Sequence, residues 1–298
     1  MVLAFLGIVL QAFPFLITGV LLSSLISFFV SERFIERHFP KNTAAGIAFA
    51  LLGGFCLPVC DCVSIPVFRS LVKKGIPLTS AIVFMTAAPV INPVVILSTY
   101  YAFNGNMRIV FARVFLGIIC SAFIGLSFLI RVPKNVLLPG EHFGGGDCGC
   151  AACASENGGR KTVHAFFEHA RLEFFGVGKY LIVGAAFSAL LQRLGGKLTF
   201  ESAPSAMAVS LFIMMALAFL LSLCSSSDAV IGRSFIARFS LVPVLGFLVF
   251  GPMLDIKNIL MLSGGFTKRF IVRFLITSFT VCFAVLFICI LCGAEAWL

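Results

Sequence analysis

The stretch CLPVCDCVSIPVF, from Cys56 to Phe68, places three cysteines, one aspartate and two prolines inside a long apolar segment. An ionisable group inside a bilayer costs several kcal/mol, so it indicates function unless a structural role is shown. Each proline removes one backbone donor and frees a carbonyl one turn earlier. The stretch therefore predicts a helix that is interrupted at membrane depth, next to a binding site.

The composition is that of a membrane protein. The 298 residues are 60% hydrophobic and 11% charged, and the mean hydropathy is +1.10. Soluble chains are about half apolar and about a quarter charged. The net charge of +10 comes from basic residues that stand in ones and twos at the ends of apolar segments, as in loops beside lipid headgroups. We therefore expect membrane lipid as a partner and no nucleic acid.

The expected fold is an all-α integral membrane protein with about eight transmembrane segments. The apolar segments cover 3–30, 44–69, 77–103, 109–130, 174–192, 206–231, 241–263 and 270–292. A polar loop rich in glycine divides them into two groups of four, which gives three parts: a first membrane repeat at 1–131, the loop at 132–163 and a second membrane repeat at 164–298.

The two groups resemble each other, which favours an internal repeat. FLITGVLLSSLI (Phe15–Ile26) aligns with YLIVGAAFSALL (Tyr180–Leu191), and APVINPVVILS (Ala88–Ser98) corresponds to GPMLDIKNILMLS (Gly251–Ser263). Four spans per repeat predict that both groups point the same way. In transporters built from repeats the site lies between the halves, on interrupted helices. The predicted helix breaks are at Pro58, Pro66, Pro89, Pro93 and Pro252. A tally of Lys and Arg is even between the two faces if all eight segments cross. It is uneven if the segments at 44–69, 77–103, 206–231 and 241–263 are re-entrant, so the sequence leaves this point open.

Polar residues inside the apolar segments form the predicted substrate site. They are Cys60, Asp61, Cys62, Asn92, Cys224, Asp228, Asp255 and Lys257. Thiolates bind soft partners such as Zn(II), Cu(I) or a trivalent metalloid, whereas an uninvolved cysteine packs as a small hydrophobe. We predict that CLPVCDCVSIP and SLCSSSD face each other between the halves. The acid and the lysine in GPMLDIKN form either a neutralised structural pair or a proton-coupling site, and both interpretations stay open.

The polar loop carries DCGCAAC, whose thiols Cys148, Cys150 and Cys153 would hold a soft metal ion in a reducing compartment. In an oxidising compartment a disulfide with one thiol left over fits as well. No other cofactor is expected. The chain has no phosphate-binding G-x-x-x-x-G-K-[ST] motif, no dinucleotide-binding motif and no H-E-x-x-H. We therefore expect neither an ATP-driven pump nor an enzyme.

The sequence resembles the bacterial ArsP/YraQ-type permeases. The similar stretches are CLPVCDCVSIPVFRSLVKKGIPLTSAIVFMTAAPVINPV in the first half, and CSSSDAVIGRSF with LGFLVFGPMLDIKNILML in the second. Val63 and Ser64 stand where the family's cysteine-rich turn usually has glycine. The resemblance implies a multi-pass protein of the bacterial inner or plasma membrane that exports thiol-reactive species, since characterised ArsP members expel trivalent organoarsenicals through membrane cysteines.

The predicted function is therefore secondary efflux of a soft, thiol-reactive solute, with arsenic resistance as its outcome. The first alternative is a permease for Zn(II) or Cu(I), or a component of metal homeostasis, with the loop thiols as a capture site. The second alternative is a non-transporting subunit that docks a second membrane protein.

Overall fold

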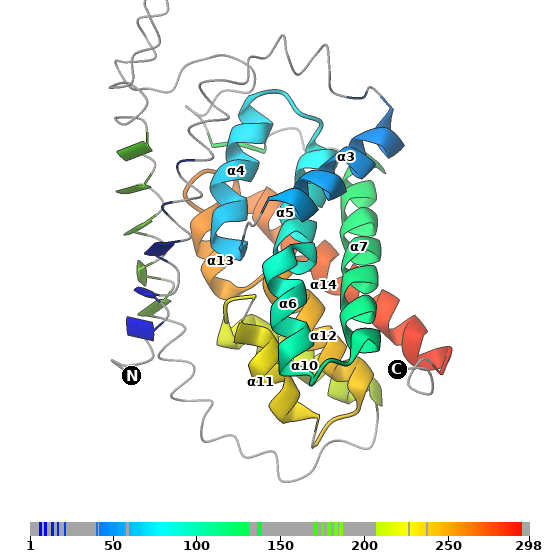
Figure 1. Ribbon diagram of the computed structural model, residues 1–298. Coiled ribbons are helices and arrows are strands. Elements are labelled where there is room, and N and C mark those ends of the chain that lie inside the picture. Colours follow the sequence, from blue (N-terminus) through cyan, green and yellow to red (C-terminus); the bar gives the residue numbers. More distant parts are fainter. Residues whose placement is uncertain are drawn as a thin grey trace, which may run out of the picture.

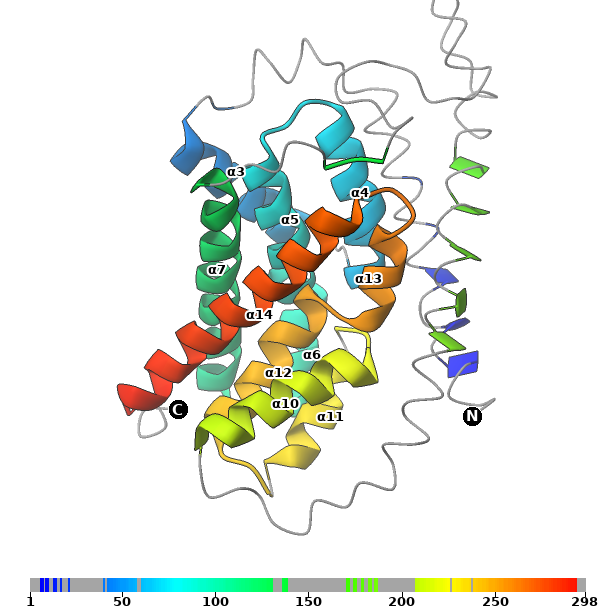
Figure 2. The ribbon, with the colours of Figure 1, turned by 180° about the vertical axis from the view of Figure 1, so that it is seen from behind.

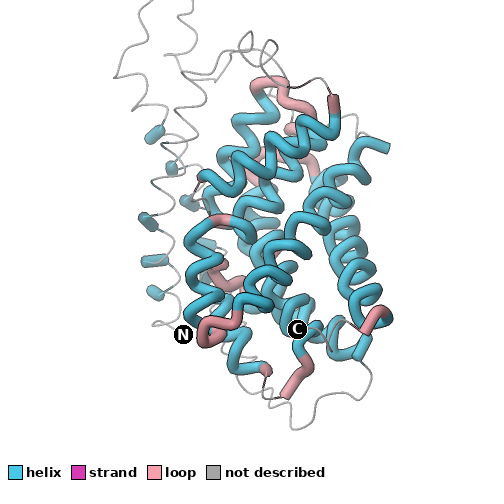
Figure 3. Tube along the Cα trace, turned by 45° about the vertical axis from the view of Figure 1, so that its right-hand side comes forward, coloured by secondary structure: helices cyan, strands magenta, loops and turns pink. Residues whose placement is uncertain are grey.

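The computed structural model describes residues 42–57, 60–130, 136–138, 207–225, 227–236 and 238–293, with scattered positions between 6 and 40 and between 170 and 186. Nearly all of this is helical (Figures 1 and 3). The longer helices are α3 (Thr43–Cys56), α4 (Asp61–Lys73), α5 (Leu78–Ile91), α6 (Pro93–Ala102), α7 (Met107–Ile130), α10 (Met207–Leu221), α11 (Ser227–Phe235), α12 (Leu241–Met253), α13 (Ile256–Leu262) and α14 (Lys268–Leu291). The all-α prediction is confirmed for these residues.

Four helical stretches are long and apolar enough to cross a membrane. They are Leu78–Ala102, Met107–Ile130, Leu241–Leu262 and Lys268–Leu291. The four remaining predicted spans fall largely outside the described residues (3–30 and 174–192) or in shorter helices (44–69 and 206–231), so the described part of the chain does not establish eight spans. The polar loop 132–163 lies outside the described residues except for 136–138.

Two of the four spans are each made of two helices joined at a break. α5 ends at Ile91, and Asn92 starts α6 because its Oδ1 accepts a hydrogen bond from Val95 N at 2.9 Å. Pro93 occupies the first turn of α6, where its missing N–H costs nothing. In the second half, Asp255 caps α13 in the same way and accepts from Asn258 N at 2.6 Å. At both breaks, therefore, the N-terminus of a helix, α6 or α13, lies inside the molecule.

The segments before these spans fold into pairs of short helices. α3 and α4 have 14 and 13 residues, about 20 Å each, which is less than the roughly 30 Å hydrocarbon core. Figure 1 shows α3 starting and α4 ending at the upper end of the molecule, whereas α10 starts and α11 ends at the lower end. Each pair thus enters from one end and returns to it, as a re-entrant hairpin does, instead of crossing as a simple span.

α7 and α14, which the predicted repeat pairs with each other, run in opposite directions. Phe128, near the end of α7, packs against Phe270 and Phe274 at the start of α14, and Arg273 of α14 donates to the Ser127 carbonyl at 3.3 Å. Figure 2 shows the two helices crossing in this antiparallel sense. The prediction that both halves point the same way is therefore wrong for these helices, because it counted each hairpin as a full crossing.

The core lies where α5 and α12 meet. All of α5 is buried, and so is α12 from Val242 to Met253. Other helices pack across the two halves, since α4 contacts α13 and α6 contacts α11. Small residues permit the closest approaches: a Cβ added at Gly54 of α3 would lie 3.2 Å from the backbone of Ala88 in α5.

Candidate functional site: a buried ionic centre

The starts of α4 and α13 meet around a buried lysine. Lys257 Nζ lies 2.8 Å from Asp61 Oδ2 and 3.4 Å from Asp255 Oδ2. All three residues are at most 2% exposed. Asp61 is the first residue of α4 and Asp255 is the N-cap of α13. Carboxylates are favoured at helix N-termini because the unpaired N–H groups there carry a partial positive charge, so both helices help to hold the acids in place.

A third buried acid, Asp228, lies in the first turn of α11. It is 2% exposed, and its Oδ2 has no hydrogen-bond partner among the described residues. Arg113 of α7 is its strongest attractive charge, and Asp61, Lys257 and Asp255 also lie within electrostatic range. The Arg113 guanidinium donates to Thr99 Oγ1 at 2.7 Å and to the Ser225 carbonyl at 3.2 Å. Asp228 and Arg113 thus join Lys257, Asp61 and Asp255 in one group of buried charges, which we call the ionic centre.

Ser222 belongs to this centre, although nothing in the sequence singled it out. It follows α10 with φ of 49°, in the left-handed region that non-glycine residues seldom adopt. Its Oγ accepts from Lys257 N at 3.3 Å, and its hydroxyl lies within electrostatic range of the Asp255 carboxylate. Strained backbone of this kind persists where the surroundings hold it, often at functional sites. Arg113 was missed too, but an arginine in the apolar run RIVFARVFLGII is a signal that could have found it.

Cys60 and Cys224 lie next to Asp61 and Asp228, the acids in the first turns of α4 and α11. Cys60 is buried and is the N-cap of α4, one residue before Asp61. Cys224 is half-buried, and its carbonyl accepts from Asp228 N at 3.0 Å. The backbone of Cys62 lies in α4, but its side chain is outside the described part of the structure. The described residues contain no group of three or more His, Cys, Asp or Glu side chains that could hold a metal ion.

Of the other predicted site residues, Asn92 has a structural role. Asn92 is buried and caps α6, at the place that Asp255 has in the second half. The thiols Cys148, Cys150 and Cys153 lie outside the described residues, so the predicted loop metal site stays a prediction.

The prolines are not all at breaks. Pro93 begins α6, whereas Pro89 and Pro252 lie inside α5 and α12 shortly before those helices end. Pro66 lies inside α4, which continues past it to Lys73, so the helix is not broken there. Pro58 is in the interval between α3 and α4 and is outside the described residues.

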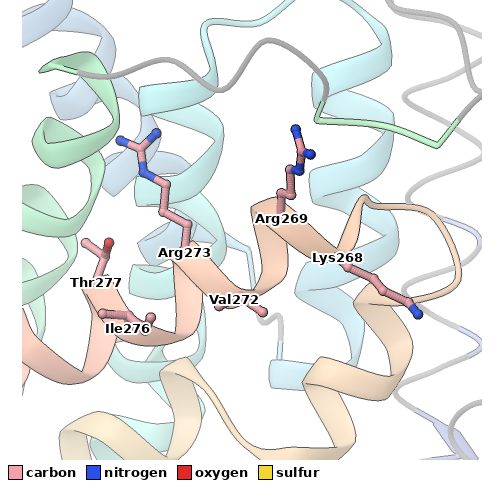
Figure 4. Close-up of a pocket in the computed structure, with 6 residues that line it drawn as sticks. All are labelled: Lys268, Arg269, Val272, Arg273, Ile276 and Thr277. Atoms are coloured by element: carbon pink, nitrogen blue, oxygen red, sulfur yellow. The ribbon is translucent and has the colours of Figure 1, made fainter.

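An open pocket lies on one face of α14, away from the ionic centre. It is lined by Lys268, Arg269, Val272, Arg273, Ile276 and Thr277 (Figure 4). Its basic residues come from the first two turns of one helix, and none of them is among the buried charges. The ionic centre, which joins helices of both halves, is therefore the better candidate for the functional site.

The chain matches a family model described as "Predicted permease" (ArsP_1) over residues 1–291. It belongs to this permease family. The resemblance to ArsP/YraQ-type permeases is thereby confirmed, and the protein is a multi-pass bacterial membrane protein and not an enzyme. No solved structure matches the chain.

Three relatives are similar to the chain. UPF0718 protein YcgR of Bacillus subtilis is 41% identical over 277 residues, which cover 93% of this chain and 92% of the relative. A Streptococcus mutans protein, provisionally named a two-component membrane permease complex subunit, is 35% identical over 92% of this chain and 89% of its own. UPF0718 protein MJ0584 of Methanocaldococcus jannaschii is 32% identical over 40% of this chain and 36% of its own length.

Proposed function

We propose that this permease is a secondary transporter that moves a small solute through the ionic centre. The observation that carries the proposal is the meeting of helix starts from both halves, α4 with α13, around buried charges. Charged groups at membrane depth are expensive, and they mark solute and ion pathways in transporters. Broken helices at the interface of two halves are the usual place of such sites.

The solute class that we propose is soft and thiol-reactive, with trivalent organoarsenicals as its representative. Supporting it, a cysteine stands beside each acid at the start of a hairpin helix: Cys60 next to Asp61, and Cys224 in backbone contact with Asp228. Thiols exchange reversibly on a trivalent metalloid, while the acids keep the surroundings polar. The Zn(II) or Cu(I) alternative has less support, because the described residues gather no set of metal ligands.

The test is expression in an arsenic-sensitive bacterial strain. Wild-type protein should protect against methylated or aromatic As(III) but not against arsenate, and Cys60→Ser combined with Cys224→Ser should remove the protection. Cys289→Ser is the matched control, since Cys289 is half-buried in α14. Equal sensitivity with and without well-expressed protein would exclude this solute class, and full protection by the double variant would exclude a role of Cys60 and Cys224 in binding it.

A second candidate function is that of one subunit in a two-component permease. The Streptococcus mutans relative is named as such a subunit, and the chain would then need a second membrane protein for transport. Purification from native membranes distinguishes the two candidates: a stoichiometric partner that is required for flux favours the subunit, and flux from the chain alone excludes an obligate partner.

A further inference from the structure

The charges in the ionic centre do not balance. The buried ionisable side chains in the described part of the chain are Asp61, Arg113, Asp228, Asp255 and Lys257, each at most 2% exposed. They comprise three carboxylates and two cations. With every group ionised, the centre would hold one uncompensated negative charge. An unpaired buried charge is so costly that such a group binds a proton or a counter-ion instead.

Distances indicate which carboxylate is least compensated. Asp61 contacts Lys257 at 2.8 Å, and Asp255 lies 3.4 Å from the same nitrogen and also accepts from Asn258 N. Asp228 forms no direct ion pair with another described residue, and its Oδ2 accepts no hydrogen bond there. Arg113 attracts it only through space, because the guanidinium is turned toward Thr99 and Ser225. The excess negative charge therefore falls on Asp228.

The helices packed on α11 supply no further cation to Asp228. α12 has no ionisable residue, and a Cβ added at its Gly251 would lie 3.4 Å from Asp228 Oδ2. The titratable residues of α6 are Tyr100 and Tyr101. On α11 itself, Arg233 is exposed and donates to the Ala102 carbonyl at 2.7 Å. The charges that act on Asp228 are thus Arg113, Asp61, Lys257 and Asp255.

We propose that Asp228 binds one exchangeable proton and that this proton is the coupling ion of the permease. Binding converts the carboxylate to the neutral acid, which gives the centre equal numbers of positive and negative charges. Release leaves the excess negative charge, which favours a change of partners around Arg113 and Lys257. The use of the proton in transport rests on the proposed function, whereas its presence on Asp228 does not.

Infrared spectroscopy of the purified protein in lipid, recorded over a pH series, tests the proposal without a solute. Wild-type protein should show the carbonyl stretch of a protonated carboxylic acid, which disappears reversibly at alkaline pH, and Asp228→Asn should lack it. Asp61→Asn removes a neighbouring negative charge, so the band should disappear about one pH unit lower. Arg113→Gln removes a positive charge, so the band should persist to higher pH. An Asp228 that stays ionised, paired with Arg113, predicts no acid band and therefore neither displacement.

Three results would overturn the inference: no acid band at any pH at which the wild-type protein is folded, a band that survives in Asp228→Asn, or a titration that neither charge variant displaces. If Asp228→Asn does not fold, the acid-band titrations of Asp61→Asn and Arg113→Gln still test the proposal. Because the spectrum requires no transport, a wrong solute class leaves this result unaffected. Stabilisation by sodium chloride but not by choline chloride, without an acid band, would assign the site to sodium and also overturn the proposal.

Discussion

Lys257 is the residue on which the ionic centre depends. A buried ammonium requires compensation, and two carboxylates supply it from different helices, Asp61 from α4 and Asp255 from the start of α13. Breaking a buried ion pair by removing one partner is costly because the other charge stays buried. The arrangement therefore links the two halves of the molecule through a single side chain.

Replacing Lys257 should destabilise the protein more than replacing Asp61. Lys257→Met leaves two carboxylates without their cation, so we expect a loss of about 3–5 kcal/mol in stability. Asp61→Asn leaves Lys257 with Asp255 and equalises the charges of the centre, so its cost should be smaller. Thermal unfolding in one detergent, followed by circular dichroism, measures the order. Equal unfolding temperatures for the two variants would contradict this account of the cluster.

The sequence identified most residues of the ionic centre but not which of them pair with each other. Asp61, Asp228, Asp255 and Lys257 stand out because an ionisable residue in an apolar segment is conspicuous. The pairing of Asp61 with Lys257 was not predicted, since it joins distant positions that only the packing of α4 on α13 brings together. The sequence paired the thiols around Cys60 with Cys224 instead. Ser222 could not be found, because its role comes from its backbone conformation.

At the scale of helices, the prolines show why breaks were only partly predictable. A proline inside a helix removes a backbone hydrogen bond, but these helices end only where a side chain caps the start of the next helix. Asn92 and Asp255 do this by capping the next helix, and the breaks lie there. No such cap follows Pro66, and α4 continues. Capping side chains beside a proline are therefore a better signal of a break than the proline alone.

Two neighbouring glycines of α3 offer a matched test of its packing on α5. A Cβ at Gly54 would lie 3.2 Å from the backbone of Ala88, whereas one at Gly53 would meet only the Phe84 ring at 3.7 Å. Gly54→Ala should cost about 1–3 kcal/mol through overpacking. Gly53→Ala should be neutral or gain up to about 1 kcal/mol from helix propensity. Unfolding temperatures that fall equally for both variants would contradict the packing.

The contact of α7 with α14 can be tested with native thiols. Cys120 of α7 and Cys282 of α14 are fully buried and lie within electrostatic range of each other. If α7 packs on α14 as described, a mild oxidant should link the fragments through these residues after cleavage at a protease site inserted between the halves. A disulfide requires Cα atoms within about 7 Å. Cys282→Ser should abolish the link, and Cys292→Ser should retain it. Fragments of the wild-type protein that stay separate after oxidation would contradict this packing.

At the scale of the whole molecule, hairpins that enter from opposite ends determine the topology. The turns between α4 and α5 and between α13 and α14 lie toward the upper end in Figure 1, whereas those between α6 and α7 and between α11 and α12 lie toward the lower end. Lys74 and Ser263 belong to the first two turns, and Asn106 and Arg238 to the other two. Eight simple crossings would instead put Lys74 and Arg238 on one side. The sequence alone could not decide, because helix lengths of about 14 residues inside longer apolar segments are not visible in hydropathy.

Labelling of single cysteines in a cysteine-free protein, with a membrane-impermeant reagent on intact cells, reads this topology. Cysteines at positions 74 and 263 should share one side, and those at 106 and 238 the other. The upper end should be cytoplasmic, since its described turns and helix ends carry Lys73, Lys74, Lys268 and Arg269. Labelling of positions 74 and 238 from the same side would contradict the arrangement of the hairpins.

The central claim is that this chain itself moves solute through its ionic centre. Its most direct test is flux of a trivalent methylated arsenical, with Zn(II) in parallel, into liposomes that contain only the purified protein and carry an imposed pH gradient. The account predicts arsenical flux above protein-free liposomes, unchanged by Cys289→Ser and reduced to the protein-free level by Asp228→Asn and by the double variant Cys60→Ser, Cys224→Ser. Wild-type flux no faster than that of these two variants would contradict it.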